Sequence, residues 1–421
     1  MSEFKFPKDF IWGSATAGHQ IEGDNIHSSN WKREQEPDFL CEETRATSGK
    51  ACNHYALWRE DTALLKELGH KTYRMSIEWS RIEPQEGVFN KEATDHYVRE
   101  LALLKESGIS VFVTLIHFVT PAWFSDLGGY GKVENLKYFE RYLEYILPII
   151  APYVDNWNIL NEFNMGYTPE ALKAKMNAIQ FHARGYHVVK QYSKAPVSTA
   201  HAFVEYVPKR AHDPFDNKMA GYVDWAINEF FFHAIRTGEI VLPFMDGLYC
   251  PEVKDSLDYW AINIYTRTLI DARAAKLSGS RFQHKRLDMV KTGFHNEMYP
   301  EIMISQLSRI QDKPVIITEN GCCTDDDRFR IVYLALYLNA LREAMDMGVD
   351  VRGYLHWSVM DNYEWNSFIP RFGLVGVDYE TFRRTPKPSA YFYKEIMEKG
   401  GFTQEMLRRY LTEMPSLGKE R

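Results

Sequence analysis

A repeated order of helix, glycine and strand runs through this chain and limits what it can fold into. Three segments place apolar residues at helical spacing, and each one ends at a glycine that precedes a short strand-like run. The glycines are Gly69, Gly108 and Gly348, and the runs after them span 71–75, 110–115 and 349–355. Strands that alternate with helices pair in parallel, so the repeat predicts an α/β fold.

Further runs of strand character bring the expected number of strands to about eight. They span 10–13, 157–160, 197–200, 260–264 and 315–318. No low-complexity segment divides the 421 residues, so the repeats predict a single (β/α)8 barrel, the TIM barrel, with its extra length in β/α loops. A doubly wound sheet is the alternative, but the chain has neither GxGxxG nor GxxxxGK[ST], the turns typical of that fold.

Composition narrows the classes of function. The chain is 45% hydrophobic and has a formal net charge of -7, so it can bury a large core and has no broad positive field for nucleic acid or an anionic membrane. Aromatic residues make up 14%, with 10 Trp, which favours a site for flat amphipathic ligands such as sugars. We expect a small-molecule ligand, and the oligomeric state stays open.

The N-terminal residues and the cysteines bear on the cellular location and on metal or cofactor binding. The N-terminal residues MSEFKFPKDF lack the basic segment and apolar run of a secretory signal, so we expect a cytosolic protein. The five cysteines are odd in number and form no CxxC, which fits a reducing compartment without disulfide or zinc. Adjacent Cys322 and Cys323 are interpreted as packing residues, with a redox pair as the alternative. We expect neither a metal ion nor an organic cofactor.

Two glutamates follow expected strands. Glu162 comes after the fourth and Glu319 after the seventh, where a barrel places its chemistry. Lying across a barrel, they suit the carboxyl pair of glycoside cleavage, one protonated and one ionised. Arg74 could stabilise an ionised Glu319 by charge, and Tyr265 could do so by a hydrogen bond. Each glutamate is also compatible with a helix N-cap neighbour or an ion-pair partner.

An ordered series of motifs surrounds these positions. They are FPKDFIWGSATAGHQIEG (6–23), YRMSIEWSRIEP (73–84), TLIHF (114–118), ILNE (159–162), INIYTR (262–267), VIITENG (315–321), GYLHWSVMDNYEW (353–365) and RFGLVGVDY (371–379). In this order they resemble glycoside hydrolase family 1, the retaining β-glycosidases. The resemblance covers almost the whole chain, which we interpret as one catalytic domain (1–421) whose last residues, roughly 401–421, form a C-terminal extension.

The resemblance implies a role for each matching residue. Glu319 would be the nucleophile and Glu162 the acid/base. Arg74, Tyr265 and Asn263 would support the nucleophile. The implied sugar contacts are Asn161 at the 2-hydroxyl, Gln20, His117 and Trp365 at the 3-hydroxyl side, Gln20 and Glu364 near the 4- and 6-hydroxyls, and Trp357 as the platform under the ring.

Some of these residues also fit a purely structural interpretation, and one position departs from the family. His117, Trp357 and Trp365 are compatible with core packing, and Arg74 with a structural ion pair. Phe163 stands where the family usually has proline after the acid/base glutamate.

We therefore expect a retaining exo-β-glycosidase that removes a terminal β-D-glycosyl residue, foremost glucose, with galactose and fucose as further sugars. One alternative is a 6-phospho-β-glycosidase, but Glu364 would repel a phosphate and residues 366–370 contain no lysine. Another is a sugar-binding protein without catalysis on the same scaffold, which the presence of both Glu162 and Glu319 disfavours.

Overall fold

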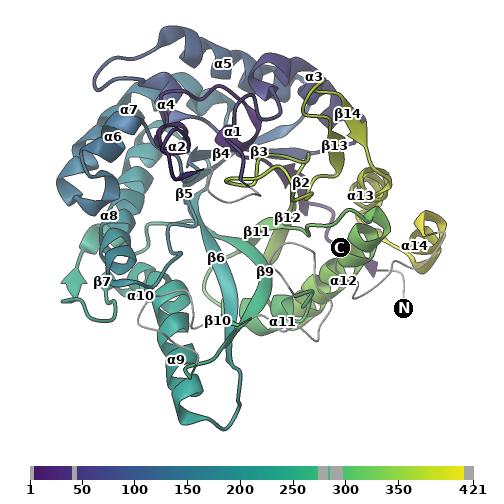
Figure 1. Cartoon of the computed structure of the whole chain (residues 1–421). Coiled ribbons are helices and arrows are strands. Elements are labelled where there is room, and N and C mark those ends of the chain that lie inside the picture. The colour runs from purple at the N-terminus through teal and green to yellow at the C-terminus, as the bar shows by residue number, and fades with distance from the viewer. Residues whose placement is uncertain (1–3, 40–44, 274–282, 285–296, 412–421) are drawn as a thin grey trace.

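Eight parallel strands close into a barrel that helices surround (Figure 1). In sheet order they are β2 (Ile11–Ala15), β3 (Thr72–Ser76), β4 (Ser110–Ile116), β5 (Asn156–Asn161), β6 (Val197–Pro208), β9 (Trp260–Ile270), β11 (Val315–Asn320) and β12 (Val351–Trp357). Pairing of β6 with β9 closes the ring. The computed structural model describes residues 4–39, 45–273, 283–284 and 297–411. The predicted α/β class and (β/α)8 barrel are confirmed.

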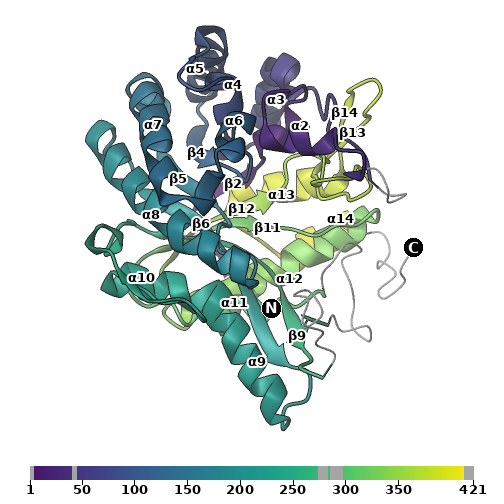
Figure 2. The same cartoon turned by 60° about the vertical axis from the view of Figure 1, so that its left-hand side comes forward.

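The helices form the outer layer of the barrel (Figure 2). The longer ones are α3 (His54–Glu67), α5 (Lys91–Glu106), α7 (Leu136–Ile150), α8 (Pro169–Tyr192), α9 (Pro214–Asp224), α10 (Phe230–Thr237), α12 (Asp327–Asp346) and α13 (Pro388–Lys399). The shorter ones are α1 (Gly18–Ile21), α2 (Ser29–Glu34), α4 (Trp79–Ile82), α6 (Ala122–Asp126), α11 (Ile302–Leu307) and α14 (Gln404–Tyr410). Gly69, Gly108 and Gly348 adopt φ of 71°, 78° and 97° just past α3, α5 and α12, which confirms the predicted left-handed caps.

Short strand pairs lie outside the barrel. They are β1 (Phe4–Lys5) with β15 (Gly401–Phe402), β7 (Glu239–Ile240) with β8 (Leu248–Tyr249), and β13 (Val375–Val377) with β14 (Arg384–Pro386), while β10 (Gln283–His284) pairs antiparallel with the end of β9.

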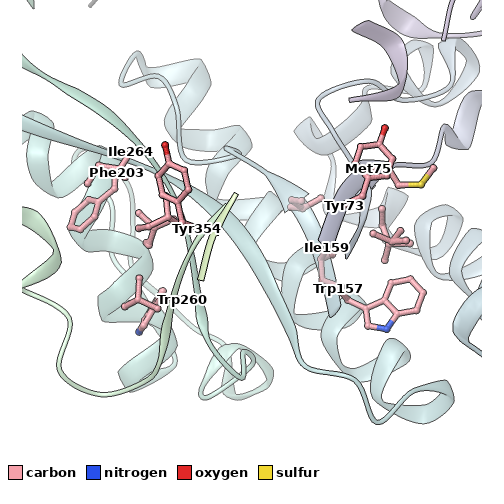
Figure 3. Close-up of a cluster of buried hydrophobic side chains, with 14 of the residues drawn as sticks. Tyr73, Met75, Trp157, Ile159, Phe203, Trp260, Ile264 and Tyr354 are labelled. Atoms are coloured by element: carbon pink, nitrogen blue, oxygen red, sulfur yellow. The ribbon is translucent and has the colours of Figure 1, made fainter. Parts of the chain in front are cut away.

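Alternate side chains of the barrel strands face opposite layers. Those that face inward meet as one apolar cluster in the centre of the barrel: Ile11, Phe112, Ala200, Ala261, Ile316 and Leu355. The intervening ones pack toward the helices, and Figure 3 labels Tyr73, Met75, Trp157, Ile159, Phe203, Trp260, Ile264 and Tyr354 among them. The centre of the barrel is thus filled, which leaves the rim for a binding site.

Two barrel strands are much longer than the sequence predicts. β6 and β9 stay paired as far as Pro208 and Ile270, beyond the expected ends at residues 200 and 264. Their second halves are partly exposed and mix polar with apolar side chains, so they lack the continuous apolar run that marks a buried strand.

The first part of the expected C-terminal extension packs on the barrel's last helix. α14 buries Met406, and its Tyr410 ring lies 5.4 Å from the Phe392 ring of α13. Tyr410 also donates a hydrogen bond to Glu395 over 3.2 Å. Residues 412–421 of the expected extension lie outside the described residues.

Candidate active site

Irregularities in two strands aim the key side chains into the mouth of the barrel. Val315 and Ile317 pack toward the helices, and strict alternation would send Glu319 the same way. A register shift between Ile317 and Glu319 changes that direction, as β-bulges do. A second shift, between Asn158 and Asn161 of β5, precedes Glu162 in the same manner. Both glutamates are therefore placed by local breaks in otherwise regular strands.

Glu319 lies against a cation and a hydroxyl. Its Oε1 accepts a hydrogen bond from Nη1 of Arg74 over 2.5 Å, and its Oε2 accepts one from the Tyr265 hydroxyl over 2.8 Å. Arg74 is fully buried, and Glu319 is only 4% exposed. Burial raises the pKa of Glu319, while the guanidinium and the hydroxyl oppose that rise. These two neighbours favour an ionised Glu319.

Glu162 has different surroundings. Its φ of 47° lies in the left-handed region, which is strained for a residue with a side chain. Its backbone N–H donates to Ala200 O over 2.7 Å, and its Oε1 accepts from Nδ2 of Asn263 over 2.9 Å. Burial, together with the charge of Glu319, raises the pKa of Glu162 to about 8. At neutral pH, Glu162 therefore keeps its proton.

A chain of hydrogen bonds connects the two glutamates. Oδ1 of Asn161 accepts from Nη2 of Arg74 over 2.6 Å and from Nδ2 of Asn263 over 3.0 Å. Thr318 donates to Oδ1 of Asn263 over 2.7 Å, which fixes the orientation of that amide. Because Arg74 contacts Glu319 and Asn263 contacts Glu162, the carboxyls sit in one rigid network.

A second part of the site combines an amide, a carboxyl and an indole. Nε2 of Gln20 donates to Asn362 Oδ1 and to Tyr363 O, both over 2.9 Å. Trp357 donates from Nε1 to Oε1 of Glu364 over 3.2 Å. Burial raises the pKa of Glu364 to about 8, against the opposing hydrogen bond from Trp357. Among the described residues, the buried Oε1 of Gln20 has no hydrogen-bond partner.

His117 lies near two indoles and next to Asn161. Its ring is nearly parallel to those of Trp357 and Trp365, with centroids 5.8 and 5.9 Å away. Its Nε2 is 3.3 Å from Nδ2 of Asn161, whereas its buried Nδ1 has no partner within the part of the chain that the structure describes. Burial holds the pKa of His117 well below its usual range, with the Arg74 charge adding to the effect, so the imidazole is neutral.

The structure brings together all the side chains that the sequence predicted for the site. The connected cluster consists of Gln20, Arg74, His117, Asn161, Glu162, Asn263, Tyr265, Glu319, Trp357, Glu364 and Trp365. It offers a protonated carboxyl, a carboxylate beside a cation, a neutral imidazole and indole faces. Such a set suits a neutral ligand rich in hydroxyls and the acid/base cleavage of one of its bonds.

The family follows from comparison with known proteins. The sequence profile described as "Glycosyl hydrolase family 1" matches residues 2–402. The chain belongs to glycosyl hydrolase family 1. It is therefore a glycoside hydrolase that acts on small-molecule glycosides, and the resemblance seen in its motifs is confirmed.

Similar proteins match this glycosidase over nearly its whole length. "Beta-glucosidase A" of Acetivibrio thermocellus is 31% identical, over 96% of this chain and 100% of that protein. "Beta-galactosidase" of Sulfolobus acidocaldarius is 28% identical, over 98% of both chains. Among solved structures, the "beta-glycosidase from Pyrococcus horikoshii" is 36% identical with a TM-score of 0.87, over 97% of this chain and 98% of that one.

Sequence reasoning missed several polar residues that support the site of this glycosidase. Thr114 accepts from Nε of Arg74 over 3.0 Å, Thr318 orients Asn263, and Asn362 holds Gln20. Thr318 and Asn362 lie within the recognised motifs, and Thr114 begins one. Their places in the motifs were a signal, but their partners lie in other strands or, for Asn362, in helix α1, and the sequence alone does not reveal these contacts.

Other expectations concern metals, membranes and cysteines. Across residues 4–39, 45–273, 283–284 and 297–411, no group of three or more His, Cys, Asp or Glu side chains could hold a metal ion. No helix in those ranges is long and apolar enough to cross a bilayer. Burial raises the pKa of Cys322 to about 12 and that of Cys323 to about 11, so both stay thiols. Cys41 lies outside the described residues.

Proposed function

We propose that this family 1 glycosidase is a retaining exo-β-glycosidase that removes terminal β-D-glucosyl residues, with galactosyl and fucosyl residues as further substrates. The observation that carries the proposal is the contrast between two carboxyls in one site. Glu319 faces Arg74 and Tyr265, whereas Glu162 faces an amide and has a pKa raised to about 8. Double displacement needs one carboxylate and one carboxylic acid. The glucosidase and galactosidase among its relatives support the choice of sugars.

In the first step, a Glu319 oxygen attacks the anomeric carbon while Glu162 gives its proton to the glycosidic oxygen. The bond from the anomeric carbon to that oxygen breaks, the aglycone leaves as an alcohol, and the sugar becomes an ester of Glu319. Tyr265 and Arg74 hold the attacking carboxylate in place. Asn161 would bind the 2-hydroxyl, a contact that strengthens as positive charge develops on the ring.

In the second step, Glu162 acts as the base. Esterification removes the negative charge of Glu319, which is one cause of the raised pKa of Glu162. The pKa of Glu162 therefore falls, so that its ionised form can take a proton from water. That water attacks the anomeric carbon and releases Glu319. Two inversions at one carbon give a product with retained configuration.

The remaining residues would bind the sugar. We infer that Gln20 and His117, each with a buried polar atom that has no partner in the described residues, satisfy ring hydroxyls. Glu364 would accept from the 4- and 6-hydroxyls, and the indole of Trp357 would lie under the ring, with Trp365 beside the 3-hydroxyl. Glu364 would lie near the 6-position, where a 6-phosphate would meet an acidic group and, in residues 366–370, no lysine, which disfavours the 6-phospho-β-glycosidase alternative.

Two measurements test this proposal. Proton NMR of the first turnover should show the β-anomer of the released sugar, and initial release of the α-anomer would contradict retention. Values of kcat/KM should be highest for aryl β-glucoside, galactoside and fucoside, and at least about 10²-fold lower for the mannoside and the 6-phosphoglucoside. A preference for the 6-phosphoglucoside would overturn the assignment. Binding of sugars without turnover would support the non-catalytic alternative.

Three further expectations from the sequence stay predictions: a single catalytic domain over residues 1–421, location in the cytosol, and catalysis without a cofactor. The last has a simple test. Dialysis against a chelator should leave kcat unchanged, and a loss of activity that a divalent metal restores would contradict it.

A further inference from the structure

The loop after Glu162 is fixed by a residue that lies outside the binding site. Asn164 is fully buried and uses its whole side-chain amide. Its Nδ2 donates to Ala202 O and to Ile227 O, both over 2.8 Å, and its Oδ1 accepts from Ala202 N over 3.0 Å. The amide therefore binds the backbone of β6 much as a neighbouring strand would, and it reaches the chain between α9 and α10 as well.

These contacts bracket the strained backbone of Glu162. On one side, the Glu162 N–H donates to Ala200 O of β6. On the other side, Asn164 binds Ala202, two residues further along the same strand. A residue with φ of 47° keeps that conformation only when its surroundings impose it. With both flanks tied to β6, the direction of the Glu162 side chain is set by a rigid strand.

Phe163, the residue between Glu162 and Asn164, does not fix the backbone of this loop by itself. Phe163 has no ring closure to fix its φ, unlike a proline. Its side chain lies edge-on to Phe230 and Phe231 of α10, with centroids 6.0 and 5.1 Å away. Such apolar contacts hold the loop near α10 but define direction weakly, whereas the hydrogen bonds of Asn164 define it closely.

The partner of Asn164 between α9 and α10 is a π-helix, Trp225–Glu229. π-Helices are rare and are frequently found at functional sites. Two of its carbonyls accept side-chain donors from the segment after β5: Ile227 O from Asn164, and Ala226 O from the buried Lys175 over 2.6 Å. Figure 1 shows α9 beside the long β6. The π-helix thus serves as an anchor for the segment that carries Glu162.

We propose that Asn164 is a positioning residue that orients Glu162 by tying its loop to β6 and to the π-helix. The inference rests on the acid/base role proposed above for Glu162. Asn164 acts through the backbone and does not contact the substrate. Its loss should therefore affect proton donation to the leaving group and leave attack by Glu319 intact.

The test compares two leaving groups in four variants. For Asn164→Ala, kcat/KM for an alkyl β-glucoside should fall by about 10²-fold, since small misplacements of a catalytic group have effects of this size. For the dinitrophenyl β-glucoside, which needs no protonation, kcat/KM should fall less than about threefold. The alkaline limb of the pH profile should also move to lower pH, because a displaced Glu162 is better solvated.

Asn228→Ala is the matched control. Asn228 is a buried asparagine of the same π-helix that binds the backbone of Val204, further along β6 and away from the Glu162 loop. Asn228→Ala should lower kcat/KM by the same small factor for the alkyl and the dinitrophenyl β-glucoside. If Asn164→Ala lowers kcat/KM equally for both substrates, the proposal is overturned, because Asn164 then has a purely structural role.

Two additions keep the outcomes separable. If Asn164→Ala does not fold, Asn164→Gln keeps the amide but shifts it by a methylene, and it too should slow the alkyl glucoside selectively; an unchanged ratio contradicts the proposal. Glu162→Ala serves as the reference. If it lacks the dependence on leaving group, the acid/base role itself is wrong; if it shows the dependence and the Asn164 variants do not, only the positioning role is wrong.

Discussion

The ends of β5 and β11 carry the same side chain in the same barrel, yet their surroundings give the two glutamates opposite properties. Glu319 continues a strand and meets a guanidinium at 2.5 Å. Glu162 follows the end of its strand, itself has a left-handed backbone conformation, and accepts a hydrogen bond from the amide of Asn263 over 2.9 Å. The neighbouring groups therefore determine which glutamate is ionised. A cation in contact favours the carboxylate, while burial without a cation in contact favours the carboxylic acid.

Removal of Glu319 should have the largest effect. In Glu319→Ala no carboxylate can form the ester, so kcat/KM should fall by about 10⁵-fold or more on every glycoside. Steady-state rates measure the loss. Added azide should then attack from the vacated side and give the α-glycosyl azide, which NMR identifies. Glu106→Ala, an exposed position, is the control. A retained β-product from Glu319→Ala would contradict the role of nucleophile.

Removal of Glu162 should discriminate between substrates. In Glu162→Ala, kcat/KM should fall by about 10²–10⁴-fold for alkyl glucosides and little for dinitrophenyl glucosides. Because the pKa of Glu162 is about 8, the wild-type profile of kcat/KM should decline as pH rises through that value, where the acid loses its proton. The variant should lack this decline. Equal slowing of both substrates, or a decline that persists, would argue for another acid.

Loss of the Arg74 charge should disfavour the ionised form of Glu319 and slow catalysis. In Arg74→Met, kcat/KM should fall by about 10²–10³-fold, the range typical when an active site loses one preorganised hydrogen-bond donor. Without the cation the pKa of Glu319 rises, so the acidic limb of the pH profile should move to higher pH. Arg74→Lys should recover part of both effects. An acidic limb that stays in place would show that Arg74 does not control ionisation.

The smallest effect concerns stability and involves Glu364. Its folded pKa of about 8 exceeds the unfolded value, so the native state holds the proton more tightly and stability falls as pH rises from about 4.5 to 8. Glu364→Gln removes the contribution of Glu364 to this pH dependence. Its Tm should match the wild type near pH 5 and exceed it by about 1–3 °C near pH 9. A difference independent of pH would contradict the buried-acid interpretation.

The sequence predicted the barrel because its strands are short, buried apolar runs between helices, which composition and periodicity reveal. It did not predict the second halves of β6 and β9, whose exposed faces carry polar residues. Nor did it predict the shifts before Asn161 and Glu319 or the π-helix, since these depend on the register of partner strands and on packing.

The motifs supplied the catalytic and sugar-binding residues but not the groups that orient them. Asn164 contacts Ala202 and Ile227, which lie 38 and 63 residues away in the chain. No local pattern marks such a contact. Positioning residues are therefore the part of the site that only the fold makes visible.

Trapping of the covalent intermediate tests the division of labour between the two glutamates most directly. A 2-deoxy-2-fluoro β-glucoside with a dinitrophenyl leaving group slows both steps but still permits the first, because the good leaving group needs no proton. Peptide mass spectrometry should find one sugar on Glu319, in the wild type and in Glu162→Ala alike. A sugar on Glu162, or an active enzyme that never acquires the label, would contradict the assignment.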